Sequence, residues 1–496
     1  MFFEFADVVA AFTPLTLAVM FLAVFGGLVV SVLPGLTSTM AVALLVPFTF
    51  GMTVELGLVM LVAVYIGGIT GGFVAATLLN IPGGPASVAT VLDAYPMAQR
   101  GDAGKALALG VIGSFFGSFL SFFSLAFVAP IIGAFALKFG PAEYFALIVF
   151  TLTCIIAISR ESMLKGLIAA CIGLLLGTIG LSDTDGIPRF TFNLQILRGG
   201  FEVMPVLIGM YTVSQLLGEI KRIKQPIEFT FASFTMKEFW EMVKFYKQCY
   251  KNALRSAGIG IGIGFLPGIG PGLANIVSYS QAKAAAEDPD SFGKGNPNGV
   301  IATETSNNAS TGASMIPLLT LGIPGCATTM MMLGAFMIHG IAPGPLLFRD
   351  HGTLMGIVIV SYLISTFFML IIQLQFINVL IKALAAPRHL LYPGIMALCA
   401  IGTYALNTNM DNIWIFLVMG LLGTLFVKLG YPLLPLVIGL ILGRMLENNL
   451  RTTLVMGHGS LTVLLDRPIA MVFLVAAALS LIISLYTLRR SRTPST

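Results

Sequence analysis

Short proline-glycine breaks interrupt the apolar stretches of this chain, and small residues that could bind an anion follow them. The first two breaks are Leu33-Pro34-Gly35 and Ile81-Pro82-Gly83-Gly84. A helix start leaves about four backbone N–H groups without a partner and carries roughly half a positive charge. Glycine lets a ligand approach that backbone, and Ser or Thr adds hydroxyl donors. Such breaks could therefore bind a carboxylate without an arginine.

The second half of the chain repeats these breaks in the same order. It carries Leu266-Pro267-Gly268 and later Ile323-Pro324-Gly325, and a further echo pairs Pro205–Gly209 with Pro435–Gly439. In a membrane, broken helices occur only where protein or an aqueous cavity satisfies the freed backbone groups. Paired interruptions at corresponding positions of two halves point to the substrate site of a transporter. The pattern predicts a duplicated secondary transporter.

We predict that the residues after the four breaks face one cavity near the bilayer midplane, so that a bulky residue at Gly83 or Gly325 would fill it. One such break taken alone more often only packs helices closely, but repetition in both halves favours binding. The predicted substrate-binding residues are Gly35, Thr37, Ser38, Thr39, Gly83, Gly84, Ser87, Gly268, Gly270, Asn275, Ser278, Gly325, Thr328 and Thr329.

A polar run in apolar surroundings precedes the fourth break. A charge at mid-bilayer costs at least about 2.5–3.5 kcal/mol, so a glutamate there should face protein or water. The alternative role for such residues is to anchor a re-entrant backbone by hydrogen bonds. The candidates for coupling a cation are Glu304, Asn307, Asn308 and Thr311.

Two other polar positions have simpler expected roles. Asp93 lies near a predicted turn, where capping a helix is its expected function. Arg444 and Glu447 are three residues apart, near a helix end, and are expected to pair with each other or to face the outer interface.

The elements that position these residues are membrane helices. Hydrophobic residues make up 57% of the chain, charged residues 10%, and the mean hydropathy is +0.95. Apolar stretches long enough to cross about 30 Å of hydrocarbon recur throughout. We therefore predict an all-α polytopic membrane protein with two inverted structural repeats, broken or re-entrant helices and about 10–12 transmembrane segments. The clearest stretches are 106–129, 142–158, 164–181, 353–381, 412–430 and 468–488.

The repeats suggest four domains. These are a first transmembrane repeat (1–220), a basic cytoplasmic linker (221–251), a second repeat (252–450), and an extra transmembrane helix with a cytoplasmic tail (451–496). The first apolar run is preceded by Glu4 and Asp7 and by no Lys or Arg, so we expect the first helix to be retained rather than cleaved as a signal peptide.

Basic residues predict the orientation. The segment from Lys221 to Arg255 is the densest basic stretch and should be cytoplasmic, as should the C-terminal Arg489, Arg490 and Arg492. The acidic N-terminus should lie outside, which gives an odd number of crossings in the first half and hence inverted repeats. Arg160 and Lys165 fit an inside loop, whereas Lys138 and Arg198 fall in loops that this parity places outside.

These motifs resemble the large membrane subunit of the tripartite tricarboxylate transporter family. The resemblance rests on Gly264–Pro271, Lys294–Ala302 with Asn307-Asn308, and Ile316–Gly325, together with Gly340–Pro345, and in the first half on Asp93-Ala-Tyr-Pro96 and Gly104–Leu107. One departure is Thr303-Glu304-Thr305-Ser306-Asn307-Asn308, where the family commonly reads Pro-Glu-Ala-Ala-Asn-Asn. The added hydroxyls could tune the substrate, so citrate is not assumed.

The resemblance implies a cation-coupled importer in a bacterial inner membrane, with no cofactor beyond a sodium ion or a proton as the coupling ion. Its implied partners are a small membrane subunit and a periplasmic solute-binding protein that delivers a di- or tricarboxylate. The lipid bilayer surrounds it, and no nucleic acid is involved. The sequence does not distinguish sodium from protons, nor does it identify the carboxylate or the oligomeric state.

Two other classes of protein stay open. A carboxylate-permeable channel would share the re-entrant loops, but its pore should carry rings of carbonyls or charges. A membrane-embedded enzyme is the less favoured alternative, because the chain has no H-E-x-x-H, no G-x-S-x-G and no Walker-type phosphate loop. The five cysteines are scattered, without a C-x-x-C pair, so disulfide and metal sites are not predicted.

Overall fold

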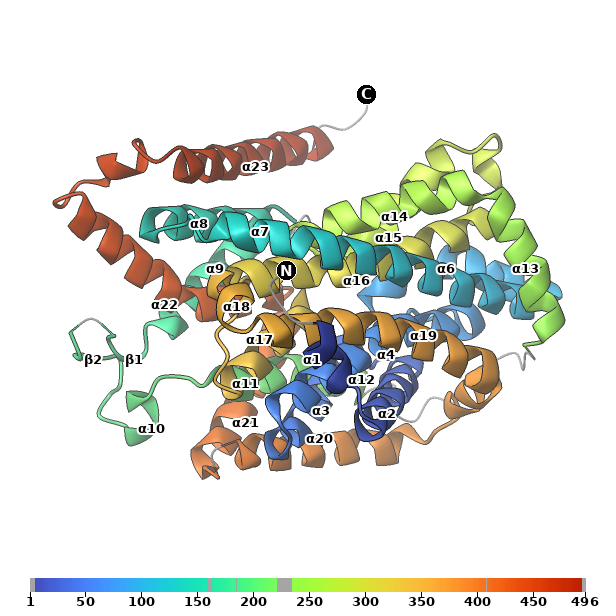
Figure 1. The fold of residues 1–496 in the computed structure, drawn as a ribbon, viewed down its shortest axis with the longest axis horizontal. Helices are drawn as coiled ribbons and strands as arrows, with labels where there is room; N and C mark the ends of the chain where they lie inside the picture. Colours follow the sequence, from blue (N-terminus) through green and yellow to red (C-terminus); the bar gives the residue numbers. More distant parts are fainter. Residues whose placement is uncertain (1–4, 159–162, 184, 221–233, 407, 493–496) are drawn as a thin grey trace. The chain divides into compact units, whose positions relative to one another are not determined.

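The structure, a computed structural model, describes residues 5–158, 163–183, 185–220, 234–406 and 408–492 (Figure 1). It is helical throughout, apart from one two-stranded hairpin in the described part of the chain. Six helices among the described residues are long and apolar enough to cross a membrane, and several shorter apolar helices accompany them. The predicted all-α polytopic membrane fold is confirmed.

The chain forms two compact units, each discontinuous in sequence. Unit 1 comprises Met1–Ala134 and Gln215–Leu406, and unit 2 comprises Phe135–Ser214 and Asn407–Thr496. These units are defined by packing, whereas the predicted segments 1–220 and 252–450 are sequence repeats, so each repeat contributes to both units.

Unit 1 contains most of the helices, with α7 and α12 at its boundaries. Its elements are α1 (Phe5–Ala10), α2 (Pro14–Val32), α3 (Ser38–Leu45), η1 (Val46–Gly51), α4 (Val54–Leu79), η2 (Pro85–Ser87), α5 (Val91–Met97), η3 (Ala98–Asp102), α6 (Ala103–Phe123), η4 (Ser124–Val128), α7 (Ala129–Ala136), α12 (Ser214–Glu219), α13 (Met236–Gln248), α14 (Tyr250–Phe265), α15 (Gly270–Ala284), η7 (Pro289–Ser291), α16 (Pro297–Leu321), α17 (Ala327–Ile338), α18 (Pro345–Asp350), α19 (Gly352–Ala383) and α20 (Arg388–Ala405).

Unit 2 holds the remaining helices and the hairpin. Its elements are α8 (Pro141–Ile158), α9 (Met163–Gly177), β1 (Gly180–Leu181), β2 (Pro188–Arg189), α10 (Gln195–Arg198), α11 (Val203–Ile208), η5 (Gly209–Val213), α21 (Met410–Lys428), α22 (Leu433–Met456), η8 (Leu461–Leu464) and α23 (Pro468–Arg492). The strands β1 and β2 pair antiparallel, with Gly180 opposite Arg189.

The first break has the same backbone geometry in both halves. The C-cap residue of α2 is Leu33 (φ −71°, ψ 123°), and that of α14 is Leu266 (φ −77°, ψ 124°). In each case a glycine with positive φ follows, Gly35 at 86° and Gly268 at 77°. Side chains with a Cβ rarely adopt this conformation, so the glycine lets the chain turn sharply into the next helix.

The helix before the second break also ends in the same way in both halves. The residue that follows α4 is Asn80 (φ 57°, ψ 26°), and the residue that follows α16 is Gly322 (φ 71°, ψ 19°). Both residues are left-handed C-caps of the kind that glycine and asparagine favour. The repeated sequence pattern therefore produces a repeated local structure.

The central helix of each half packs both on a helix of its own half and on a helix of the other half. Helix α4 packs on α2 of its own half and on α19 of the other, while α16 packs on α14 of its own half and on α6 of the other. The segment after the second break does the same, because η2 contacts α15 and α17 contacts α3. Such reciprocal contacts are those that two copies related by a two-fold axis make. The inverted orientation of the repeats in the membrane stays a prediction.

Part of the predicted basic linker forms an amphipathic helix. Helix α13 begins at a capping box, in which Thr235 and Glu238 satisfy each other's backbone N–H groups. Its apolar face buries Phe239 and Tyr246, whereas Trp240 is exposed. The linker's Lys221, Arg222 and Lys224 lie outside the described residues.

Helices α4 and α16 form the core of unit 1. Every residue of 57–78 in α4 and of 299–321 in α16 is buried. Glycines allow the close approach of α2 to α4: a Cβ built on Gly27 would lie 2.5 Å from the carbonyl oxygen of Val64, and one on Gly67 would lie 2.2 Å from that of Val24. Small residues at helix contacts are the usual basis of helix association in membranes.

This contact predicts opposite outcomes for two adjacent glycines of α2. Gly27→Ala should destabilise the folded protein by about 1–3 kcal/mol, because the added methyl group overlaps backbone that cannot move aside. Gly26→Ala should be neutral or slightly stabilising, since a Cβ there meets nothing within 4 Å and alanine favours the helix. Thermal unfolding of the purified protein in detergent measures both. Equal effects of the two variants would contradict the α2–α4 packing.

Candidate functional site

The four breaks lie together in unit 1, although they are far apart in sequence. The first and second meet where a Cβ on Gly84 would lie 3.2 Å from the Cγ2 of Thr37. The third and fourth meet where the Gly268 N–H donates to the Pro324 carbonyl oxygen at 3.2 Å. Within each half of the chain, the two breaks therefore contact each other.

Hydroxyl groups join the first half to the second. The Thr328 Oγ1 lies 3.0 Å from the Ser38 Oγ and 3.0 Å from the Thr39 Oγ1. Ser38 and Thr39 begin α3, and Thr328 lies in the first turn of α17. The N-termini of two helices from different halves therefore meet at a shared cluster of three hydroxyls, which we call the hydroxyl junction.

The hydroxyl junction is positively polarised. Thr37 caps α3 by accepting the Met40 N–H at 3.4 Å, and the Cys326 sulfur caps α17 by accepting the Thr329 N–H at 3.5 Å. Each cap satisfies one of the roughly four N–H groups that a helix start leaves without an intrahelical partner. Two helix N-termini, each carrying about half a positive charge, repel each other unless an anion lies near them.

Most of the predicted substrate-binding residues are buried, and four of them are partly exposed. The partly exposed residues are Gly35, Thr37, Ser38 and Gly84; the buried ones are Thr39, Gly83, Ser87, Gly268, Gly270, Asn275, Ser278, Gly325, Thr328 and Thr329.

The sequence analysis predicts a cavity beside Gly83 and Gly325, but the structure shows close packing at both glycines. A Cβ on Gly83 would lie 2.4 Å from the Cα of Gly72, and one on Gly325 would lie 2.6 Å from the carbonyl oxygen of Ser314. Both glycines therefore pack directly on helix backbone, Gly83 on α4 and Gly325 on α16. A bulky residue at either position would collide with the core of the unit instead of filling a cavity.

Asn275 holds the second break from the other half of the chain. Its Oδ1 accepts the Ala89 N–H at 2.7 Å, and its Nδ2 donates to the Thr90 Oγ1 at 3.2 Å. Ser278, one turn further along α15, is buried, and its hydroxyl has no hydrogen-bond partner in the described part of the chain. The sequence placed both residues beside the third break, and the structure places Asn275 at the second break as well.

The predicted cation-coupling residues form a fully buried network. The Glu304 Oε1 accepts the Thr90 hydroxyl at 2.5 Å, and its Oε2 accepts the Asn307 Nδ2 at 3.1 Å. The same amide also donates to the Ala86 carbonyl oxygen at 2.9 Å. No ion pair joins Glu304 to a Lys, Arg or His of the described residues. A buried carboxylate with neutral partners only is costly unless a proton or a cation neutralises it.

Asn308 extends this network to α4 and α6. Its Nδ2 donates to the Ser114 Oγ at 3.0 Å, and its Oδ1 accepts the Thr70 hydroxyl at 2.9 Å. Thr311 is more remote from Glu304 and instead pairs with the Tyr362 hydroxyl of α19. Thr90 and Ser114 are not among the residues predicted from the sequence, where their only signal is a hydroxyl group close to a break or within an apolar stretch.

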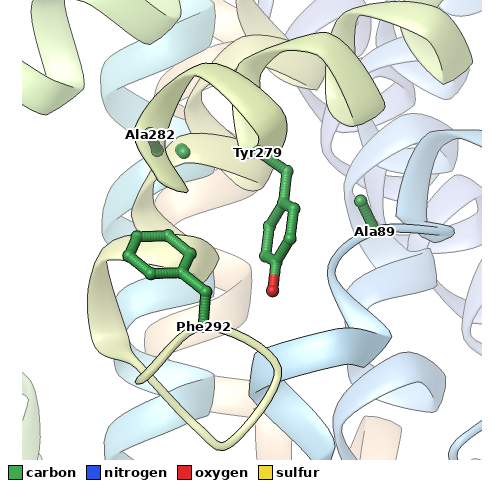
Figure 2. Packing of buried hydrophobic residues seen from close by; sticks show 5 residues of the cluster. Ala89, Tyr279, Ala282 and Phe292 are labelled. Atoms are coloured by element: carbon green, nitrogen blue, oxygen red, sulfur yellow. The ribbon is translucent and has the colours of Figure 1, made fainter. Parts of the chain in front are cut away.

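Asp93 ties the two halves together rather than capping a helix. Its Oδ1 accepts three backbone N–H groups of the loop before α16, from Gly293 at 2.9 Å and from Gly295 and Asn296 at 2.8 Å. The expected capping role is therefore wrong, because Asp93 is buried and its partners are 200 residues or more away in the chain. Figure 2 shows the neighbouring packing, with the Tyr279 ring between Ala89 and Phe292.

This fold and these paired breaks define an α-helical multi-pass membrane protein whose two halves repeat the same local structure. The chain belongs to the tripartite tricarboxylate transporter TctA family, whose model matches residues 17–438. The predicted resemblance is confirmed. The chain thus falls in a family of transporters.

Two relatives come from Agrobacterium vitis. One is an uncharacterized 52.8 kDa protein of the TAR-I ttuC′ 3′ region, 35% identical over 482 residues, which cover 97% of this chain and 95% of the relative. The other is a protein of the TAR-II ttuC′ 3′ region, 36% identical over 230 residues, which cover 46% of this chain and 95% of the relative. No solved structure matches the chain.

The packing at the fourth break predicts the effect of filling it. Gly325→Leu should abolish the yield of folded protein, because its side chain would overlap the α16 backbone at Ser314. Gly262→Leu is the matched control, since a Cβ at this position of α14 meets nothing within 4 Å. The measurement is the monodisperse fraction after detergent extraction. Normal yield of Gly325→Leu with loss of transport alone would favour an open cavity at this glycine.

Proposed function

We propose that this chain is the large membrane subunit of a cation-coupled importer of a di- or tricarboxylate in a bacterial inner membrane. A periplasmic solute-binding protein delivers the substrate, and a small membrane subunit completes the transporter. The N-terminus lies in the periplasm and the C-terminus in the cytoplasm. The observation that carries the proposal is the hydroxyl junction, where two helix N-termini from different halves of the chain meet.

The hydroxyl junction supports carboxylate binding for electrostatic reasons. Two positively polarised helix starts and the hydroxyls of Ser38, Thr39 and Thr328 offer several hydrogen-bond donors to one anionic group. A hydroxyl can turn its proton toward an arriving carboxylate and return it to its neighbour when the carboxylate leaves. Multipoint binding without a fixed cation suits a carrier, since the substrate must also be released.

Glu304 supplies the coupling step in this proposal. When the carboxylate is ionised and buried without a cationic partner, binding a sodium ion or a proton removes the cost of the charge. The surrounding oxygen atoms of Thr90, Asn307 and Asn308 are of the type that bind hard cations. The negative charge of the substrate and the positive charge of the coupling ion then enter the same part of unit 1.

The second break connects the two sites. Thr90 and Ala86, which bond Glu304 and Asn307, flank the segment that follows Gly84. Gly84 in turn lies against Thr37, the N-cap of α3 at the hydroxyl junction. Loading Glu304 with a cation therefore acts on the break that lies beside the substrate. This is the route by which we propose that ion binding and substrate binding are linked.

Removing one hydroxyl tests the substrate site. Thr328→Val keeps the shape of the side chain but removes the group that bonds both Ser38 and Thr39. Hydrogen bonds to charged groups contribute about 1.5–3 kcal/mol, so the KM for the carboxylate should rise about ten- to a hundredfold. Thr320→Val is the matched control, because the one hydrogen bond of the Thr320 hydroxyl among the described residues goes to the Ile316 carbonyl oxygen of its own helix.

The measurement is uptake of radiolabelled citrate, tartrate or succinate into proteoliposomes that contain both membrane subunits, with the loaded binding protein outside. An unchanged KM in Thr328→Val for every transported carboxylate would place the substrate elsewhere.

Neutralising Glu304 tests the coupling. Glu304→Gln keeps a hydrogen-bond acceptor for Thr90 but cannot bind a cation by charge. Uptake against a concentration gradient should be lost, while exchange of substrate at equal concentrations continues. Glu143→Gln is the control, since the buried Glu143 already has a cation, Arg467, at 3.5 Å.

Imposed gradients of sodium ions and of protons, each applied alone without ATP, identify the coupling ion. Wild-type uptake that requires ATP and ignores both gradients would overturn the secondary mechanism. Normal accumulation by Glu304→Gln would overturn the role of Glu304 alone.

A further inference from the structure

Unit 2 carries an apolar surface on a segment that is not helical for most of its length. The described residues 180–183 and 185–200, which we call the hairpin segment, contain β1, β2 and α10 and lie between α9 and α11 in the chain (Figure 1). Five of its large apolar side chains are about half exposed or more. Their exposed fractions are 48% for Leu181, 58% for Ile187, 59% for Phe190, 79% for Phe192 and 53% for Leu194.

Charged residues fix the hairpin segment to α22. The Arg189 Nη1 lies 2.7 Å from the Glu447 Oε1, and the Arg451 Nη1 lies 3.7 Å from the Asp185 Oδ2 of the hairpin segment. Arg444 donates to the Gly199 carbonyl oxygen at 3.4 Å, so it does not form the local pair with Glu447 that its spacing suggested. These contacts hold the hairpin segment, which carries the exposed apolar side chains, against α22.

The backbone of this segment is not suited to the hydrocarbon core of a membrane. Lipid-exposed backbone in the bilayer core must be helical or form a closed barrel, because unpaired N–H and C=O groups there cost several kcal/mol each. Among its described residues, the regular secondary structure consists of two strands of two residues each and one helix of four residues. Its exposed apolar side chains consequently face water or the membrane surface rather than lipid tails.

The predicted topology places this surface in the periplasm. The apolar helix α9 separates the segment from the predicted inside loop at Arg160 and Lys165. Helices α11 and α12 with η5 separate it from the basic stretch that begins at Lys221. One crossing on each side places the hairpin segment opposite both basic regions.

Two of the exposed aromatic residues have unfavourable backbone conformations. Phe190 has φ 52° and Phe192 has φ 47°, in the left-handed region that bulky residues rarely adopt. Such conformations are strained and persist where the surroundings impose them. Both residues with this backbone conformation also have exposed phenyl rings.

We propose that the hairpin segment is the surface on which the periplasmic solute-binding protein docks, which rests on the proposed function. Its five side chains expose roughly 500 Å² of apolar area, against about 800 Å² per partner in a standard protein interface. The exposed Arg198 and the Arg189, Glu447 and Arg451 cluster supply a charged rim. An apolar centre with aromatic residues and a polar rim that includes arginine is the composition of protein interfaces.

The test measures docking and transport separately. Proteoliposomes that contain both membrane subunits receive increasing concentrations of the substrate-loaded binding protein, and the half-saturating concentration is determined. Phe192→Ser and Phe190→Ser should each raise it at least tenfold, with the maximal rate at saturation unchanged. Leu421→Ser, at a residue of α21 that is 62% exposed, should leave both values unchanged. Direct binding of the purified binding protein to nanodiscs should weaken by the same factors.

Three outcomes would overturn the proposal. Half-saturating concentrations that stay within twofold in both phenylalanine variants would exclude a docking role. Quenching of Phe192→Trp fluorescence by brominated lipids would assign the surface to the membrane. A cross-link from position 192 to a second copy of this chain, without one to the binding protein, would assign it to self-association. Failure of the proposed function is distinguishable, because the wild type would then transport no carboxylate at any concentration of binding protein.

Discussion

Every broken helix in this protein must find partners for the backbone groups that the break releases, and the rest of unit 1 is arranged around that requirement. In the bilayer there is no bulk water to accept these groups, so protein must supply the partners. The Pro324 carbonyl oxygen accepts from Gly268 in another break, and the Ala89 N–H donates to Asn275. The fourth break thus satisfies a backbone group of the third, and α15 satisfies a backbone group of the segment after the second.

This constraint also accounts for the composition of the two central helices. Helix α16 has a mean hydropathy too low for a lipid-facing span of its length and is absent from the six candidate membrane spans of the described residues, yet it is buried from Gly299 to Leu321. Its amides and hydroxyls bind the second break through Asn307 and bind α4 and α6 through Asn308. Polar residues here replace the water that the broken backbone lacks.

The glycines serve two different purposes. Gly35 and Gly268 give the chain a left-handed turn after the first break of each half. Gly83 and Gly325 instead allow one backbone to rest against another at distances that exclude a Cβ. The hydroxyl junction is positively polarised, and its Ser38 is partly exposed. Glu304 is fully buried, and no Lys, Arg or His in the described part of the chain forms an ion pair with it. In the proposed function these two features hold the substrate and the coupling ion.

The sequence by itself determined the helical membrane fold, the four breaks and the family, because these depend on local composition and on motifs of adjacent residues. It also pointed to Glu304, Asn307 and Asn308 as candidates for coupling a cation, since polar residues in an apolar run are visible without a structure. Only the tertiary structure decided which breaks meet, because the α3–α17 contact joins residues 38 and 328, which no local pattern relates. It also decided that Asp93 binds the loop before α16 and that Gly325 packs on backbone, since a one-dimensional pattern does not specify what lies opposite a side chain.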